Sequence, residues 1–242
     1  MALERILMRH GIKGGLLDYD DVLCETFDLF SGIVTGCVDE LAEETGVDKN
    51  DLREKFNRIE KHIFKTHRVH PSRWAEILKN LRKEVPEISP QMARDGVERL
   101  LGIYQQVPEL QPCAGETLES LRNAGLKLAI VTHRYEPWHE LVINAHGIRG
   151  YFDTEVVVGP KNLKTERHWK QAAKRLELSP GECLGVEDRV LGVLAMANIG
   201  VGSLWWVKSR WDFYAEGENL LPERTNRINR FSELVPGLLA LE

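Results

Sequence analysis

The second half of the chain alternates short apolar runs with longer segments in which apolar residues recur at three- and four-residue spacing. The short runs predict buried strands, and the periodic segments predict helices with one apolar face. The predicted strands cover 126–132, 154–158, 183–186 and 201–207, and the predicted helices cover 116–124, a segment with Pro137 in its first turn, 165–176, 190–197 and 229–239. This alternation indicates an α/β fold with a Rossmann-like parallel sheet and helices on both faces.

Residues 24–107 have a different character, because helical periodicity dominates there and strand signals are scarce. A first helix is expected to end at Gly46, and Asp48 is placed to cap a second one. Two further helical patterns cover 74–81 and 92–104. We therefore predict that a helical domain is inserted into an α/β core formed by residues 1–23 and 108–242.

The first apolar run of the core, residues 14–17, ends in three carboxylates within four positions, Asp18, Asp20 and Asp21. Carboxylates crowded at the end of a buried strand repel one another, and a hard cation such as Mg²⁺ neutralises them. Side chains alternate along an extended chain, so Asp18 and Asp20 are expected to point the same way. These two residues are the predicted working pair.

Composition narrows the possible functions. The chain has 242 residues, 43% of them hydrophobic, so it can bury a substantial core, and its net charge of −5 gives no electrostatic reason to expect nucleic acid. The four cysteines are widely spaced, which is typical of free thiols in a reducing compartment. No apolar run has the length of a signal peptide or a membrane span. We expect a cytoplasmic monomer or homodimer without a membrane partner.

Polar groups also follow the predicted strand at 126–132. In a parallel sheet the ligand binds at the carboxyl ends of the strands, where the Thr132 hydroxyl and the backbone N–H after it can bind a phosphoryl oxygen. His133 and Arg134 come next. They either reach the substrate or face solvent, and solvent exposure is the usual expectation for such residues.

A lysine and two further acids occupy comparable positions. Lys164 precedes the helix predicted at 165–176, and Lys161 is the alternative three residues earlier. A lysine near carboxylates keeps a nucleophile ionised and offsets charge on a transferring phosphoryl group. Glu187 and Asp188 follow the strand at 183–186 and could complete a Mg²⁺ site.

The segment Asp18-Tyr19-Asp20-Asp21-Val22-Leu23 resembles the first motif of the haloacid dehalogenase superfamily of phosphotransferases. Residues matching the later motifs follow in the family's order: Thr132, Lys164, Glu187 and Asp188. Two positions depart from the pattern, since Thr165 replaces the usual proline and Arg189 the usual serine. A helical insert between the first and second motifs resembles the type-one helical cap of phosphoglycolate phosphatase-like and β-phosphoglucomutase-like enzymes.

The resemblance implies a role for each matching residue. Asp18 would be the nucleophile and Asp20 the general acid and base, with Thr132 and Lys164 completing the catalytic set. Contacts to the phosphate would come from Tyr19, Thr132, His133 and Lys164. The ligands of a Mg²⁺ ion would be Asp18, Asp20, Glu187 and Asp188.

These roles predict a Mg²⁺-dependent phosphatase that hydrolyses a small phosphorylated metabolite through an aspartyl-phosphate. A β-phosphoglucomutase-like phosphomutase and a non-catalytic binding or regulatory protein are the alternatives. A haloacid dehalogenase is disfavoured because that enzyme lacks the second aspartate, which is present here as Asp20. The run 61–70 is the only strongly basic segment of the insert, and it either meets an anionic substrate or forms a solvated helix end.

Overall fold

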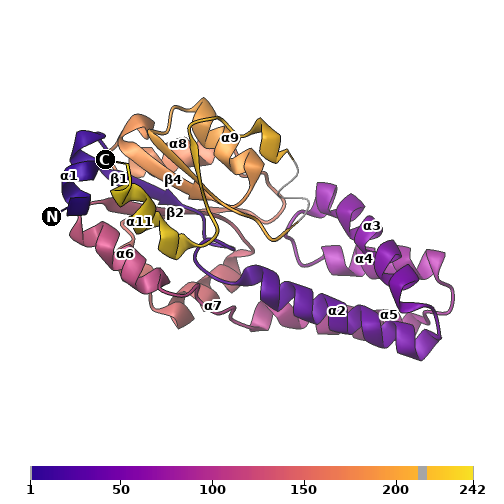
Figure 1. Cartoon of the computed structure of the whole chain (residues 1–242). Coiled ribbons are helices and arrows are strands. Elements are labelled where there is room, and N and C mark those ends of the chain that lie inside the picture. The colour runs from indigo at the N-terminus through magenta and orange to yellow at the C-terminus, as the bar shows by residue number, and fades with distance from the viewer. Residues whose placement is uncertain (1, 212–216, 242) are drawn as a thin grey trace.

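The computed structural model describes residues 2–211 and 217–241, and these residues form a parallel sheet with helices around it (Figure 1). The sheet has six strands in the order β3-β2-β1-β4-β5-β6, and every neighbouring pair is parallel. The strands are β1 (Gly14–Leu17), β2 (Lys127–His133), β3 (Thr154–Val158), β4 (Cys183–Glu187), β5 (Ser203–Val207) and β6 (Thr225–Ile228). The predicted α/β fold is confirmed.

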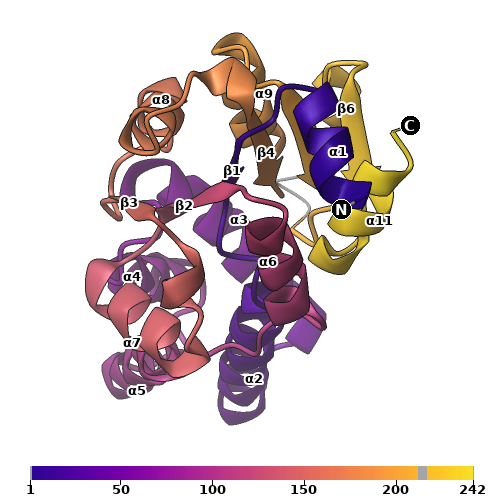
Figure 2. The same ribbon diagram turned by 90° about the vertical axis from the view of Figure 1, so that its left-hand side faces the viewer.

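Helices cover both faces of this sheet, as the view in Figure 2 shows. One face carries α8 and α9, and the other carries α1, α6 and α11. The helices of the α/β core are α1 (Ala2–Arg9), α6 (Ala114–Asn123), α7 (Glu136–His146), α8 (Glu166–Arg175), α9 (Val190–Asn198) and α11 (Leu234–Leu239). Single 3₁₀ turns cover Gly102–Gln105, Arg149–Tyr151, Pro180–Glu182, Glu218–Leu220 and Phe231–Glu233.

The alternation of side chains along the strands divides the apolar core into two layers. Leu16 packs with Trp169 and Val193 under α8 and α9, whereas the next residue, Leu17, belongs to the cluster on the opposite face with Leu118. All five of these side chains are fully buried. The period of two that predicted the strands therefore also assigns each residue to its face.

Four helices lie together beyond one edge of the α/β core, and we call them the cap (Figure 1). They are α2 (Thr26–Thr45), α3 (Lys49–His67), α4 (Arg73–Glu84) and α5 (Pro90–Leu101). Gly46 ends α2 in a left-handed conformation with φ of 72°, and Asp48 caps α3 by accepting hydrogen bonds from two backbone N–H groups at 3.0 Å. None of the described helices combines the length and the apolar character needed to cross a bilayer.

The described residues that follow β5, from 208 onward, are where the predicted elements differ most from the structure. The helix expected at 229–239 is broken into a 3₁₀ turn and α11, and β6 precedes it as an unpredicted edge strand. The aromatic residues Trp211, Phe213 and Tyr214 are expected from the sequence to pack on the core or to form a subunit contact, with core packing favoured. Trp211 does pack against the buried core cluster, and it contacts Phe27 and Phe30 of α2 at ring-centroid distances of 4.9 and 6.3 Å. Phe213 and Tyr214 lie outside the described residues.

Close backbone contact at Gly202 gives a test of the packing. A Cβ at this position would lie 2.2 Å from the backbone carbonyl oxygen of Gly181, and the backbone cannot yield as a side chain can. We expect Gly202→Ala to lower the free energy of unfolding by about 1–3 kcal/mol, measured by urea denaturation.

Gly32→Ala is the matched control, because Gly32 lies inside α2 with nothing within 4 Å of the added Cβ. That change should raise the unfolding free energy by about 0.5–1 kcal/mol. Equal effects of the two substitutions would contradict the packing described for Gly202.

Candidate active site

The candidate site lies where β1, β2 and β4 end at the same edge of the sheet. Leu17, the last residue of β1, is in register with Ile130 of β2 and with Val186 of β4. Asp18 therefore leaves the sheet between the ends of its two neighbouring strands. Because β1 is central and its neighbours are parallel, groups from distant parts of the sequence converge there.

Lys164 connects two of these strand ends. Its Nζ lies 2.6 Å from Asp18 Oδ2 and 2.6 Å from Glu187 Oε2, and only 2% of its side chain is exposed. Burial alone would lower the pKa of the Lys164 ammonium, but the two carboxylates outweigh that effect and raise it. Lys161, the alternative from the sequence, is exposed.

Three buried carboxylates form a group that fits a divalent cation. Oxygen atoms of Asp18, Glu187 and Asp188 all lie within 4.8 Å of one another. Burial and the neighbouring carboxylates raise the pKa of both Asp18 and Asp188. One ammonium, that of Lys164, pairs with two of the three acids. The all-oxygen donor set and the uncompensated negative charge match what Mg²⁺ prefers.

Asp188 is held in place by groups that the sequence did not reveal. Ser209 donates its hydroxyl to Asp188 Oδ2 at 3.0 Å, and the indole N–H of Trp206 donates to the Asp188 carbonyl at 2.6 Å. Both donors come from β5 or the segment after it. Their positions depend on the pairing of β5 with β4, which no local pattern around Asp188 indicates.

Asp20 has a different partner from Asp18. The Nε of Arg134 donates to both Asp20 carboxylate oxygens at 2.9 Å, and Thr26 donates its hydroxyl to Oδ1 at 2.6 Å. Burial alone would raise the pKa of Asp20, but the guanidinium outweighs it and holds the pKa below its usual value. The Asp20 carboxylate is not a member of the cluster formed by the other three acids, which leaves its backbone carbonyl as the possible metal ligand.

The expected solvent exposure of His133 and Arg134 is wrong. Arg134 is 1% exposed and His133 is 7% exposed, and both line the same cavity as Asp18. The Arg134 guanidinium lies 4.2 Å from the ring centroid of Trp138, another residue of the cavity wall. An arginine immediately beyond a strand end was the available signal, but its buried partner, Asp20, is remote in sequence.

Thr132 and His133 present polar groups at the end of β2. Thr132 is fully buried, and within the described parts of the chain its hydroxyl has no hydrogen-bond partner. Burial, with help from the positive charges of Arg189 and Lys164, lowers the pKa of His133 to about 3. The imidazole is therefore neutral at pH 7.

The side chain of Tyr19 does not line the cavity, so it does not make the direct phosphate contact that the resemblance implies. Its hydroxyl lies 2.8 Å from Nδ1 of His146, and the two rings are stacked at a centroid distance of 6.0 Å. Side-chain alternation explains this position, because Tyr19 lies between two residues that face the site. Its backbone N–H, which donates to Asp18 Oδ1 at 2.8 Å, is the group left to contact a ligand.

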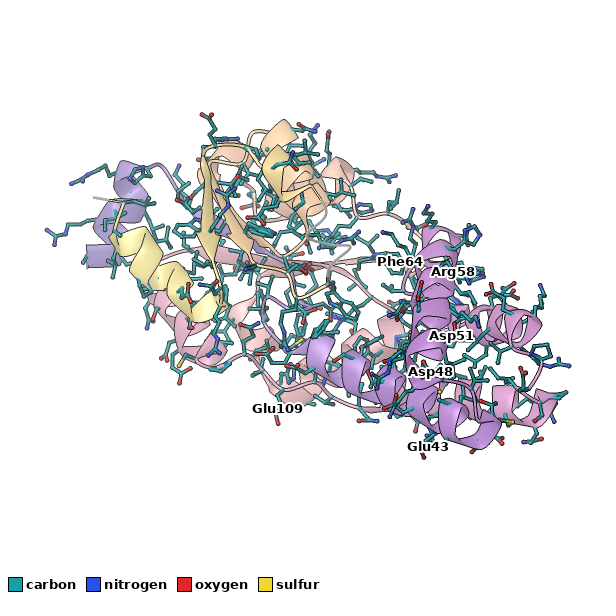
Figure 3. All side chains as sticks on the ribbon, turned by 45° about the vertical axis from the view of Figure 1, so that its right-hand side comes forward. Glu43, Asp48, Asp51, Arg58, Phe64 and Glu109 are labelled. Atoms are coloured by element: carbon teal, nitrogen blue, oxygen red, sulfur yellow. The ribbon has the colours of Figure 1, made fainter. Side chains whose placement is uncertain are left out.

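The cap closes the cavity above these groups. The cavity has a volume of about 70 Å³; the cap contributes Phe30, Glu60, Phe64 and Arg73 to its walls, and the 3₁₀ turn after α5 contributes Tyr104. Figure 3 shows Phe64 at the end of α3 that faces the α/β core, whereas Asp48 lies at the far end. Within the basic run 61–70, Phe64 and Val69 line this cavity, and the charged side chains do not.

Known proteins resemble the chain in sequence. It is 30% identical over 125 residues to a phosphoglycolate phosphatase of Vibrio vulnificus, a match that covers 49% of the chain. The chain thus spans about half the length of that relative, 54%. It is also 28% identical over 167 residues to PpaX of Clostridium perfringens, named as a pyrophosphatase, with 64% of the chain and 76% of the relative covered.

Solved structures share the fold. A haloacid dehalogenase-like hydrolase of Xanthomonas campestris superposes with a TM-score of 0.75 at 15% identity, covering 96% of this chain and 92% of that one. A Thermotoga maritima protein described as a β-phosphoglucomutase gives a TM-score of 0.68 at 21% identity, covering 96% and 100%. The model of the haloacid dehalogenase-like hydrolase family matches residues 12–200. The chain therefore belongs to the haloacid dehalogenase-like hydrolase family.

Proposed function

We propose that this protein is a Mg²⁺-dependent phosphatase that hydrolyses a small phosphorylated metabolite through an aspartyl-phosphate on Asp18. One observation carries the proposal: Asp18 lies at the end of the central strand, 2.6 Å from the Lys164 ammonium and within a cluster of buried carboxylates. A nucleophilic carboxylate for phosphoryl transfer needs such positive charge beside it. The names of the two sequence relatives, a phosphoglycolate phosphatase and a pyrophosphatase, support the same reaction class.

The first step forms the covalent intermediate. An Asp18 carboxylate oxygen attacks the phosphorus in line, a new O–P bond forms, and the bond to the leaving oxygen breaks. A protonated Asp20 donates its proton to that oxygen, so the product leaves as an alcohol; this step needs the carboxyl form of Asp20, which the Arg134 pair disfavours by lowering its pKa. In the second step Asp20 takes a proton from water, the water oxygen attacks phosphorus, and Asp18 is released with inorganic phosphate.

Other residues stabilise and orient the reacting group. Lys164 offsets charge on the transferring phosphoryl group. The hydroxyl of the buried Thr132, which has no partner among the described residues, is available to donate to one of the phosphoryl oxygens. Arg134 fixes the carboxylate of Asp20 through two contacts of 2.9 Å. Bound between Asp18, Glu187 and Asp188, Mg²⁺ would supply electrostatic stabilisation of the phosphoryl oxygens.

A phosphomutase is a second candidate because Glu187, the residue before Asp188, is buried and paired with Lys164. The Glu-Asp form of this motif resembles that of β-phosphoglucomutase-like enzymes. A mutase would return the phosphoryl group from Asp18 to a sugar phosphate. Turnover that requires a sugar bisphosphate activator, with no net release of phosphate, would identify it.

We expect Asp18→Asn to abolish the release of phosphate from 4-nitrophenyl phosphate, with a loss of about 10³-fold or more. An amide cannot form the aspartyl-phosphate. Removal of Mg²⁺ with EDTA should stop the wild-type reaction, and added Mg²⁺ should restore it. Asp95→Asn, on the exposed side of α5, is the control and should keep wild-type activity. Metal-independent release, or an active Asp18→Asn protein, would refute the proposal.

The same substitution at each position tests which of the two lysines considered from the sequence, Lys164 or Lys161, acts in the reaction. Lys164→Met should lower kcat by about 10²-fold or more, because the buried ammonium beside Asp18 is lost. Lys161→Met should stay within about threefold of wild type, since Lys161 is exposed.

Lys164→Arg, which keeps the charge, checks that the loss is not one of folding, and thermal unfolding is measured for each variant. A larger effect at Lys161 than at Lys164 would contradict the assignment.

A further inference from the structure

Arg73, the first residue of α4, is a buried cation in the cap wall of the cavity. It is 4% exposed, and its Nε has no hydrogen-bond partner among the described residues. Its Nη1 donates to the backbone carbonyl of Arg68 at 3.2 Å. The guanidinium lies 4.1 Å from the Trp74 ring centroid and 5.5 Å from that of Phe30. These rings replace some of its lost hydration but supply no negative charge.

Arg73 has no close counter-ion in the described part of the chain. Over residues 2–211 and 217–241 it forms no ion pair, whereas Lys164 and Arg134 are paired with acids. Glu60 lines the same cavity, and burial, the larger effect, raises the pKa of its carboxyl while the charge of Arg73 lowers it; the two side chains do not form an ion pair. A buried cation without a counter-ion is costly, and an anion that enters the cavity removes this cost.

We propose that Arg73 binds a second anionic group of the substrate, a carboxylate or a phosphate, remote from the phosphoryl group that is transferred. The inference rests on the proposed phosphatase function and deepens it by naming a substrate class: short phosphate esters that carry a second acidic group. Asp18 and Lys164 receive the phosphoryl group from the side of the core. Arg73 faces the same cavity from the side of the cap.

The cavity is suited to this recognition. Arg73 and Asp18 line the same cavity, so one small molecule can contact both. Aromatic side chains, among them Phe64, Tyr104 and Trp138, exclude water from its walls and so strengthen any contact between charges. A guanidinium offers two parallel N–H donors to a carboxylate or phosphate, which adds directional selectivity.

Two pairs of esters test the proposal with purified protein. 2-Phosphoglycolate is compared with ethyl phosphate, and propane-1,3-diol bisphosphate with propyl phosphate, so the pairs distinguish a carboxylate from a phosphate. In at least one pair the wild type should prefer the ester with the second acid by about tenfold or more in kcat/KM. The preference should appear mainly in KM.

Arg73→Gln should reduce this preference to about threefold or less, because kcat/KM falls more for the ester with the second acid than for the plain ester. Arg73→Lys keeps the charge without the planar donor pair and should retain an intermediate preference. Arg82→Gln makes the same change on the exposed side of α4 and should behave as wild type. If Arg73→Gln does not fold, Arg73→Lys is read in the same assay.

The proposal is overturned if the wild type shows no preference in either pair, or if the Arg73 variants lose activity equally on both members of a pair. A different result would overturn the proposed phosphatase function: no release of phosphate by the wild type from any of these esters or from 4-nitrophenyl phosphate. In that case calorimetry with malonate tests the anion site alone. If the wild type binds malonate and Arg73→Gln does not, the site is supported. If neither protein binds malonate, or if both bind it equally, the site is refuted.

Discussion

The burial of negative charge at the carboxyl edge of the sheet is the constraint on which the rest of the site depends. Asp18, Glu187 and Asp188 are almost completely removed from water, and each would be unstable there as an isolated ion. The Lys164 ammonium, 2.6 Å from two of them, compensates part of this cost. The remaining charge explains why the site fits a divalent cation.

Two aspartates two residues apart are held in different electrostatic states by different partners. Burial and the nearby carboxylates raise the pKa of Asp18, whereas Arg134 lowers that of Asp20. The proposed roles need the opposite arrangement, an ionised Asp18 for attack and a protonated Asp20 for the leaving oxygen. A divalent cation beside Asp18 would favour its ionised form, so the role of Asp18 depends on the metal and not on the paired side chains alone.

The cap contributes a different kind of chemistry from the core. The core presents charged groups that are paired with one another, while the cap presents aromatic rings, the Glu60 carboxyl and the buried guanidinium of Arg73. Rings that exclude water make a single cation more discriminating, because the local dielectric is low. Reaction and selectivity are accordingly assigned to separate halves of one cavity.

The sequence alone determined the parallel sheet and the strand ends where the acids gather, because these follow from the hydrophobic period. It also determined the boundary between the first two cap helices, because Gly46 ends α2 and Asp48 caps α3. Tertiary structure decided the rest. Arg134 pairs with Asp20 across 114 residues, and Tyr19 turns toward His146 across 127. The edge strand β6 and the contacts of Trp211 are likewise set by neighbours remote in sequence. Burial and charge pairing depend on which distant groups meet, and no local pattern encodes that.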